Sequence, residues 1–420
     1  MGRARSWPIS ASPEEFSLHA LSSARLGADF TKLWAASAVS NIGDGVTMVA
    51  GPLLTSTLTR DPALIAGAAF VQALPWLLFS LISGAYVDRV DRRRLILAVD
   101  LARGATLAAL SALIATGTVT IPLLYGVFFL LGTGETLADT ASVARLPAIV
   151  PPERLTSANA LLMATFTIGN QFLAKPLGAA LFLMAAAVPF GVNAVTFVVA
   201  AVLVASMRPV HIDDVPQPRR ALRNEIAEGL RWLWSQQLLR TLAVAMAVAN
   251  LAFCGAFAVF VLYAEERLGL SPAGYGLLLT TFGVGGLVGT ALADRLQRRL
   301  GAAVLLRAGL VVEAATHLTL ALTRQTWLAA AILVIFGVHT MVWGVIAGTV
   351  RQRMTPDRLR GRVSGVHALI DAGGVAAGML WGGLAAHSVA VTTPFWIAAA
   401  LTSLVTLTSW RSLGRASPFG

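Results

Sequence analysis

Long stretches without a charged side chain dominate this sequence and limit what it can fold into. Residues 62–87, 241–264 and 268–293 contain no Asp, Glu, Lys or Arg, and residues 176–207 and 372–410 form longer runs of the same kind. A transmembrane helix needs about 20 consecutive apolar residues. Charged residues make up 13% of the chain, about half the share of roughly 25% that is usual in soluble domains. We therefore expect an integral membrane protein with many spans.

Two markers recur at nearly equal offsets and divide the chain into related halves. A short basic turn at residues 84–95 contains the pattern Asp-Arg-x-x-Arg-Arg, and residues 289–300 contain it again, with Asp294 lying 206 positions after Asp88. The sequence Pro-Glu-Arg-Leu at 152–155 likewise matches Pro-Asp-Arg-Leu at 356–359, at an offset of 204. Internal repetition of this kind is typical of secondary transporters.

With these motifs, the sequence resembles the Major Facilitator Superfamily over residues 33–410. The turn at 84–95 is similar to the loop between the second and third helices of that superfamily. Three further stretches resemble the bacterial drug exporters related to the enterobactin exporter and the macrolide efflux proteins. They are Asn41-Ile-Gly-Asp-Gly, Glu135-Thr-Leu-Ala-Asp and the loop from Arg351 to Arg362.

The resemblance implies an all-α membrane protein with twelve transmembrane helices in two pseudo-symmetric six-helix halves. The spans are expected near residues 33–58, 64–87, 95–115, 121–143, 158–183, 188–207, 241–264, 275–293, 302–322, 327–350, 363–387 and 391–410. The domains are expected to be an N-terminal tail (1–31), a first half (32–207), a linker (208–240), a second half (241–410) and a C-terminal tail (411–420). Within the linker, residues 219–239 have apolar side chains at helical spacing, which predicts an amphipathic helix on the membrane surface.

The distribution of positive charge predicts the orientation in the membrane. The formal net charge is +11, but the arginines gather in every second loop, and this positive-inside pattern argues against a nucleic acid partner. Arg60, Arg267 and Arg324 occupy the alternate loops. We expect both termini and the linker to be cytoplasmic, in the inner membrane of a bacterium. We expect the working unit to be a monomer.

Ionisable residues inside the predicted spans are the strongest functional signal, because such residues are rare in a bilayer and usually mark substrate or proton pathways. Asp44 and Glu313 lie near mid-depth in the first and ninth spans, and Glu135 lies in the fourth span. Burial favours the protonated form of a carboxyl group, so these acids are candidate proton carriers. Structural hydrogen bonding between helices is the alternative. The set of expected contacts to the proton or the substrate is Asn41, Asp44, Glu135, Asn170, Gln171, Glu313 and Trp343.

The resemblance also implies an inner gate. In the superfamily the aspartate of the loop motif caps a helix of the other half, and the arginines bridge to acidic groups when the transporter faces outward. Carried over to this chain, Asp88 is the capping carboxylate, and Arg89 and Arg92 are the bridging cations. The full set expected at the gate is Gly84, Asp88, Arg89, Arg92, Asp139, Asp294, Arg295 and Arg298. The alternative is a basic loop that only sets topology.

Other polar residues in the spans receive structural interpretations or stay open. Asp100 and Arg103 are three apart on a helix and are expected to pair with each other. Lys175 can extend to the outer surface, pair with a membrane acid or meet an anionic substrate, and Asp371 can belong to the gate. Each histidine in the second half is expected to be isolated and structural. Cys254 has no second cysteine with which to form an intrachain disulfide.

These observations predict a secondary active transporter that exports a small, partly apolar compound, such as an antibiotic, drug or siderophore, by proton antiport. The sequence has no phosphate-binding loop for ATP, so a proton gradient is the expected driving force. The sequence shows no pairing of a nucleophile with a base that would predict an enzyme. No cofactor is expected. An importer of the same fold is one alternative, and a non-transporting membrane partner or sensor is another.

Overall fold

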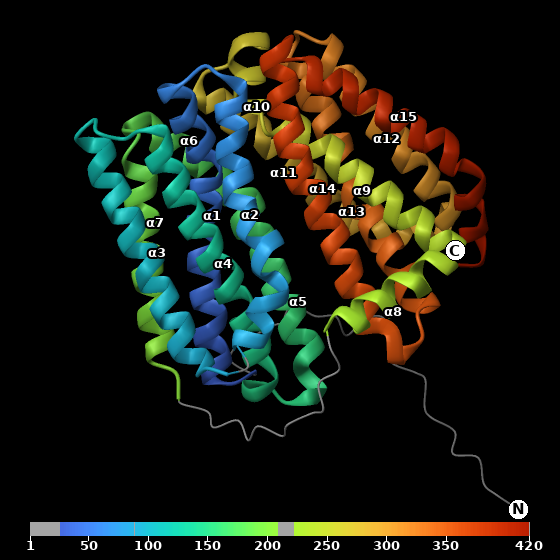
Figure 1. The fold of residues 1–420 in the computed structure, drawn as a ribbon, viewed down its shortest axis with the longest axis horizontal. Helices are drawn as coiled ribbons and strands as arrows, with labels where there is room; N and C mark the ends of the chain where they lie inside the picture. The colour runs from blue at the N-terminus through green and yellow to red at the C-terminus, as the bar shows by residue number, and fades with distance from the viewer. Residues whose placement is uncertain (1–25, 88, 209–221, 420) are drawn as a thin grey trace, which may run out of the picture.

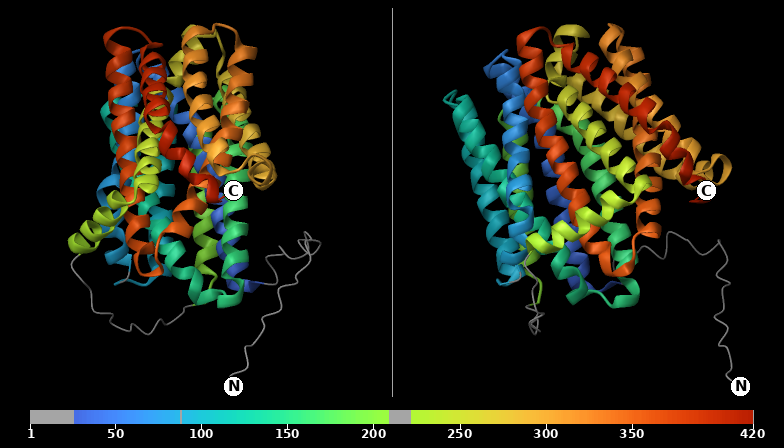
Figure 2. Two further views of the ribbon diagram at one scale, coloured as in Figure 1. Left: turned by 90° about the vertical axis from the view of Figure 1, so that its right-hand side faces the viewer. Right: turned by 45° about the vertical axis from the view of Figure 1, so that its right-hand side comes forward.

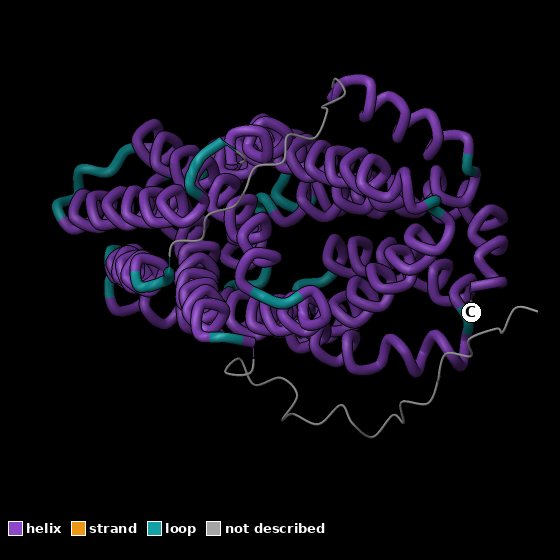
Figure 3. The backbone as a smooth tube through the Cα atoms, turned by 90° about the horizontal axis from the view of Figure 1, so that it is seen from below, coloured by secondary structure: helices purple, strands orange, loops and turns teal. Residues whose placement is uncertain are grey.

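The computed structural model describes residues 26–87, 89–208 and 222–419, and within these ranges all regular structure is helical (Figure 3). Residues 1–25, Asp88, residues 209–221 and Gly420 lie outside the described part of the chain. The expectations for the N-terminal tail, for Asp88 and for the first part of the linker therefore stay predictions.

The helices of the first part of the chain pack mainly against one another. In this group α1 packs on α6 and α7, α2 on α4, and α3 on both α4 and α7. The helices are α1 (Ala28–Leu58), α2 (Pro62–Val87), α3 (Arg92–Ala115), α4 (Ile121–Ile149), α5 (Leu155–Phe166), α6 (Ala174–Met184) and α7 (Val188–Ala205). A π-helical segment, Thr167–Leu173, connects α5 to α6. We refer to these elements as the first group (blue to green in Figure 1).

The remaining helices form a second group (yellow to red in Figure 1), in which α11 packs on α13, α9 on α14 and α15, and α12 on α13 and α15. They are α8 (Leu222–Ser235), α9 (Gln237–Phe257), α10 (Phe260–Leu262), α11 (Pro272–Leu300), α12 (Ala302–Leu322), α13 (Thr326–Met354), α14 (Arg360–Ser388) and α15 (Thr393–Leu413). Short π and 3₁₀ turns, Tyr263–Arg267, Asp357–Leu359 and Gly414–Phe419, follow α10, α13 and α15.

Nine helices of the described residues are long and apolar enough to cross a membrane. They are α2, α3, α4, α7, α9, α11, α12, α13 and α14. The predicted fifth span is interrupted because the π-helical segment divides it into α5 and α6, each shorter than a bilayer requires. The charged and polar residues of α1, and the threonines and serines of α15, lower the hydropathy of those two helices.

The second copy of the basic motif is helical, which corrects the expectation of a loop there. α11 continues to Leu300, so Asp294, Arg295 and Arg298 lie on its last two turns rather than in a turn between spans. Asp294 and Arg298 form an exposed ion pair four residues apart on this helix. The chain reverses at Gly301, where a φ of +76° suits glycine. Alanine and leucine favour helix, and the pair on the helix surface supports its extension.

The amphipathic helix of the linker ends earlier than the expected residue 239 and packs partly on protein. α8 covers Leu222–Ser235, and Gln236 separates it from α9. One face of α8 contacts the beginning of α14. Leu233 is buried there, and Glu228 accepts a hydrogen bond from Arg362 at 2.6 Å. Trp234, 45% exposed, stays on the outer face. If α8 lies on the membrane surface, only the outer face that carries Trp234 is available to contact the lipid.

Contacts between the two groups gather at one end of the bundle, which we call the α10 end. Small residues allow this approach, because a Cβ on Gly383 would lie 2.4 Å from that of Ala66, and one on Gly276 would lie 2.3 Å from that of Ala179. The opposite end carries α5 and α8 (Figure 2) and the arginines near residues 89–94 and 351–362, and we call it the arginine-rich end.

Ion pairs reinforce the α10 end. Arg60, which follows α1, pairs with Glu265 of the second group, and Ser56 donates a hydrogen bond to the same carboxylate at 3.2 Å. Asp61 and His387 meet with 2.8 Å between Oδ1 and Nδ1. His387 was expected to be isolated, and the structure corrects this by placing it against a carboxylate of the other group.

Candidate functional site

A cavity of about 460 Å³ lies between the two groups of helices. α1, α2 and α4 supply most of its first wall, and α14 supplies the facing wall. Its polar lining residues are Asp44, Thr47, Gln72, Arg103, Glu135, Asn170 and Asp371. The structure thus brings together three of the residues expected from sequence, Asp44, Glu135 and Asn170, although they come from three different helical segments.

Arg103 is the central cation of this cavity. Its Nη2 lies 2.9 Å from Oδ1 of Asp44, and its guanidinium carbon lies 4.1 Å from the centre of the Phe197 ring. The side chain of Arg103 is 7% exposed and that of Asp44 is 22% exposed, so water screens the pair less than it would screen a pair on the surface. The expected pairing of Arg103 with Asp100 on its own helix is therefore replaced by a bond to α1. Asp100 is also buried, and it acts on Arg103 only at longer range.

Gly134 makes the position of Arg103 possible. A Cβ at Gly134 would lie 2.8 Å from both Cγ and Cδ of Arg103, closer than carbon atoms approach without repulsion. Glu135, which follows this glycine on α4, lines the same cavity as Arg103. Glu135 and Asp139 both interact electrostatically with Arg103, and Asp139 is exposed.

The π-helical segment is fixed against α1. Asn170, 6% exposed, donates a hydrogen bond to the backbone carbonyl of Asn41 at 3.0 Å. A Cβ on Gly45 would lie 2.7 Å from the backbone oxygen of Asn170, so glycine is required for this approach. The Asn41 carbonyl therefore has a structural partner. Of Gln171 we describe only the backbone, which lies in the π-helical segment.

Two further cavities extend into the second group of helices. One, of about 320 Å³, shares Met48, Phe257, Val375 and Met379 with the central cavity. The other, of about 80 Å³, adjoins Glu313 and shares Phe253, Phe282 and Phe336 with the 320 Å³ cavity. The three spaces therefore adjoin one another through shared wall residues.

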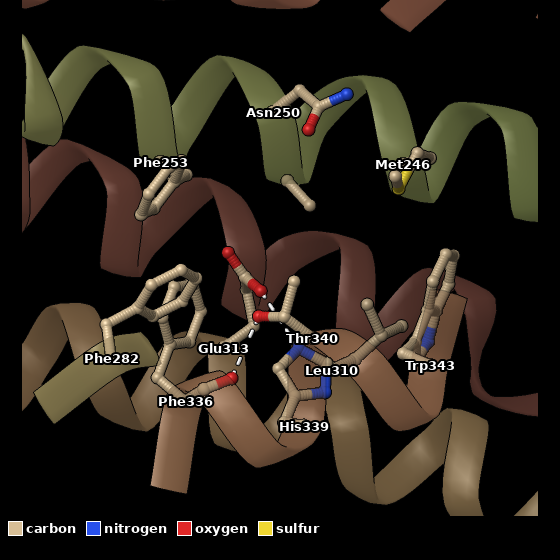
Figure 4. Close-up of a pocket in the computed structure, with 11 residues that line it drawn as sticks. Met246, Asn250, Phe253, Phe282, Leu310, Glu313, Phe336, His339, Thr340 and Trp343 are labelled. Carbon is tan, nitrogen blue, oxygen red and sulfur yellow. Dashed lines mark hydrogen bonds and ion pairs between the residues drawn. The ribbon is translucent and has the colours of Figure 1, made fainter. Parts of the chain in front are cut away.

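Glu313 is surrounded by polar and aromatic groups (Figure 4). It is 5% exposed, its Oε2 lies 3.0 Å from Nε2 of His339, and its Oε1 lies 3.4 Å from Nε2 of His317. The expectation that these histidines are isolated is wrong, because packing of α12 on α13 brings His339 to the carboxylate. Trp343 lines the same cavity and donates from Nε1 to the carbonyl of Leu306 at 3.3 Å.

Sequence reasoning missed two parts of the site. One is Arg103, and the other is the aromatic wall formed by Phe253, Phe282 and Phe336. A signal for Arg103 existed, since it is one of two charged residues in the otherwise uncharged stretch 95–134. His317 also had one, lying four residues after Glu313 on a predicted helix. Nothing in the local sequence distinguishes Phe253, Phe282 and Phe336 from lipid-facing phenylalanines.

Two residues of undecided role can now be placed. Lys175 is 3% exposed on α6, and its Nζ lies 5.5 Å from the centre of the Phe282 ring in the second group. Extension to the outer surface is thereby excluded for Lys175. Asp371 lines the central cavity from α14, accepts a hydrogen bond from Asn250 at 3.4 Å and lies 3.7 Å from Nε2 of His367.

Gly84, Arg89 and Arg92, which were expected at the gate, lie at the arginine-rich end, whereas Asp88 is outside the described residues. Gly84 belongs to the last turn of α2, and Arg89 is exposed in the turn that follows. Arg92 donates to the backbone carbonyl of Ala144 at 3.1 Å, within its own group of helices. Asp91 caps α3 by accepting hydrogen bonds from the backbone N–H groups of Arg93 and Arg94.

Comparison with known proteins supports the class of protein expected from the sequence, a membrane transporter. A family model of the major facilitator (MFS) type, described as "Transmembrane secretion effector", matches residues 22–415. The multidrug efflux pump Tap of Mycolicibacterium fortuitum is 27% identical over 362 residues, covering 79% of this chain and 82% of the pump. The enterobactin exporter EntS of Citrobacter koseri is 26% identical over 375 residues, covering 87% of each chain. An uncharacterized MFS-type transporter of Mycobacterium tuberculosis is 33% identical over 155 residues, and this match spans only 35% of either chain.

The fold also matches solved structures. A bacterial homologue of the iron transporter ferroportin, in its inward-facing state, superposes with a TM-score of 0.73 over 94% of this chain and 99% of that one. The two sequences are 16% identical, so this likeness concerns the fold alone. The family match covers nearly the whole chain, and the relatives are transporters rather than enzymes. This multi-pass membrane protein therefore belongs to the major facilitator transporters, in the family described as transmembrane secretion effectors.

Proposed function

We propose that this protein exports a small, partly apolar compound across the cytoplasmic membrane in exchange for protons. The observation that carries this proposal is the buried Arg103–Asp44 pair, which shares a cavity between the two groups of helices with Glu135. The names of the Tap and EntS relatives, a multidrug efflux pump and an enterobactin exporter, support efflux as the direction.

The proposed architecture is twelve spans in two halves, residues 32–207 and 241–410. It counts α1, the α5–α6 segment and α15 as spans in addition to the nine helices above. Pairing of the first helices with one another, and of the later helices with one another, supports the division. The arginines at one end favour a cytoplasmic location for that end, the linker and both termini. A single chain is the proposed working unit, and no cofactor is required.

The conformation supports alternating access around the central cavity. The α10 end, held by the Arg60–Glu265 and Asp61–His387 pairs, would be the closed outer mouth. Asp139, which is exposed, would face an opening toward the cytoplasm. The inner gate would then form only when the halves rock to the outward-facing state. In that state Asp88, Arg89 and Arg92 would meet the second half, with Asp294, Arg295 and Arg298 as their symmetry counterparts.

Charge balance gives a physical reason for proton exchange. Asp44 and Glu135 share the cavity with one guanidinium, that of Arg103, and one cation cannot neutralise two carboxylates in a site poor in water. At least one acid therefore holds a proton whenever the cavity is closed to solvent. Glu135 is the proposed carrier, because Asp139 continues its face of α4 toward the arginine-rich end. Asn41, Asn170 and Gln171 would support this site, and Trp343 would contact the substrate.

The test begins with a drug-susceptibility panel in an efflux-deficient bacterial host, which supplies a transported compound. Flux of that compound is then measured in proteoliposomes with and without an imposed pH gradient. We expect Glu135→Gln to bind the compound but lose acceleration by the gradient, because the amide cannot carry a proton. Gradient-driven flux that persists in both Glu135→Gln and Asp44→Asn would refute this coupling site, and accumulation in the uptake direction would refute export.

A further inference from the structure

A second buried ionisable cluster, consisting of Glu313, His317 and His339, has no role in the proton exchange proposed above. It belongs to α12 and α13, whereas Asp44, Arg103 and Glu135 belong to α1, α3 and α4. Glu313 Oε1 and His317 Nε2 lie 3.4 Å apart without forming a hydrogen bond, and His317 Nδ1 has no hydrogen-bond partner among the described residues. The cluster adjoins a cavity of about 80 Å³, so its buried polar groups can be reached by a bound molecule.

Aromatic rings enclose the approach to this cluster (Figure 4). Phe253 lies 6.1 Å from Phe282 and 5.5 Å from Phe336, measured between ring centres, and Phe282 lies 5.6 Å from Phe336. Trp343 stands on the other side of Glu313. The 80 Å³ beside the carboxylate exceeds the ~10–15 Å³ that one water molecule occupies. The 320 Å³ cavity continues beyond the three phenylalanine rings.

A carboxylate inside an aromatic box is the chemistry that recognises organic cations, because ring faces attract positive charge and exclude water. The protein itself already places one cation against this wall, since Lys175 lies over Phe282. We propose that the Glu313 cavity is a binding site for organic cations, with the positive group at Glu313 and the apolar part in the 320 Å³ cavity. This proposal rests on the proposed function and names its substrate class.

Competition with a proton follows from the two histidines. With Glu313 ionised, one proton on His317 or His339 makes the cluster neutral overall, which is the favourable state for a buried group. A bound organic cation supplies that charge instead and releases the proton. Because the proton and the organic cation compete for the same cluster, cation affinity should rise as the proton concentration falls, that is, with increasing pH.

The other titratable groups around the cluster do not replace Glu313. Cys254 of α9 and Lys175 of α6 line the 320 Å³ cavity, and Lys175 repels a second cation, which places the ligand charge at the Glu313 end. α15, which packs on α12, carries Arg411 in its last turn. α11 presents Phe282 to the cavity, while Tyr275 lies in its first turn and its charged residues lie near its other end.

The experiment measures binding by the purified full chain in detergent, with tetraphenylphosphonium as the probe. Tetraphenylborate has the same shape and the opposite charge, so it separates charge recognition from apolar binding. Affinity and proton release are measured calorimetrically at about pH 6 and about pH 8, in buffers of different ionisation enthalpy. We expect the cation to bind more tightly at the higher pH, with proton release, and the anion to bind at least tenfold more weakly.

Variants test the assignment to Glu313. Glu313→Gln should lose roughly tenfold or more in cation affinity together with the proton release, because the charge-assisted contact is gone. Glu313→Asp, which keeps the charge, should retain the release, and Phe336→Leu should lose roughly 2- to 30-fold in affinity. Glu266→Gln, at an exposed position, is the matched control and should bind like the unaltered chain. Thermal unfolding of each variant checks folding.

The proposal is overturned if Glu313→Gln binds the cation as the control does, or if the anion binds equally well. It is also overturned if Glu313→Gln does not fold while Glu313→Asp and Phe336→Leu both bind normally without proton release. Failure of this binding site can be distinguished from failure of the proposed export, because the binding assay does not depend on flux. Cation binding with proton release in a chain that shows no gradient-driven flux would refute proton-coupled export and leave this site standing.

Discussion

Replacing Gly134 with alanine should disable proton coupling without removing any charged group. The added methyl group would lie 2.8 Å from Cγ and Cδ of Arg103 and 3.2 Å from Cγ1 of Val99. Carbon atoms in contact prefer a separation of ~3.5–4.0 Å, so the arginine stem must move by roughly 0.7 Å or more. Arg103 Nη2 would then lose its 2.9 Å contact with Asp44.

The size of the effect can be worked from this overlap. Overpacking a tight interior costs about 1–3 kcal/mol. If that cost falls on the arrangement in which Arg103 meets Asp44, its population drops by about 5- to 150-fold. The site would keep all its carboxylates but would lack the cation that balances them, so proton exchange should fail more severely than substrate binding.

Gly126→Ala is the matched control on the same helix, since no described atom lies within 4 Å of the position that its Cβ would take. Flux with and without a pH gradient is measured for both variants in proteoliposomes, and thermal unfolding reports their stability. We expect gradient-driven flux to fall by about 5- to 150-fold in Gly134→Ala, the range estimated above. In Gly126→Ala the flux should stay normal. Equal flux in the two variants would refute the argument that Arg103 must cross Gly134.

Two other predictions concern topology and gating. Because of the arginine distribution, a reporter that is active only in the cytoplasm should work when fused after Arg94, Arg220 or Gly420. The same reporter should fail at Asp61, Gly117 or Gln325. Activity at any of these last three positions would contradict twelve spans. Glu265→Gln removes the partner of Arg60 and should favour the outward-facing state, whereas Asp88→Asn should favour the inward-facing state. Cysteine labelling from either side, with Glu266→Gln as control, measures both shifts, and shifts of the same sign would contradict opposed gates.

Local composition determined the class of this protein and the placement of most of its helices. Whether a stretch of 20 residues can cross a bilayer depends on the transfer of its own side chains, so residues 62–87, 241–264 and 302–322 could be recognised as helices without any neighbour. The repeated motifs and the acids at 44, 135 and 313 are likewise properties of the chain alone. The resemblance of the motifs to a known superfamily predicted a major facilitator transporter, and the family match confirms that prediction.

Helix boundaries near polar segments were less predictable. The motif at residues 289–300 predicted a loop by analogy with residues 84–95, yet the chain continues as α11 to Leu300. The π-helical segment at Thr167–Leu173 also escaped prediction, because the close contact of Gly45 with the Asn170 backbone is made between two spans. Such features depend on how one helix packs against another, and a single-chain pattern does not contain that information.

Only the tertiary structure decided which charges meet. Asp100 is three residues from Arg103 in sequence, but the rotation of α3 and the absence of a side chain at Gly134 direct the guanidinium to Asp44 on α1. His339 reaches Glu313 because α13 packs against α12, and three phenylalanines from α9, α11 and α13 close the box around them. Hydropathy fixes how deep each residue lies in the membrane, whereas helix rotation and crossing fix its partners.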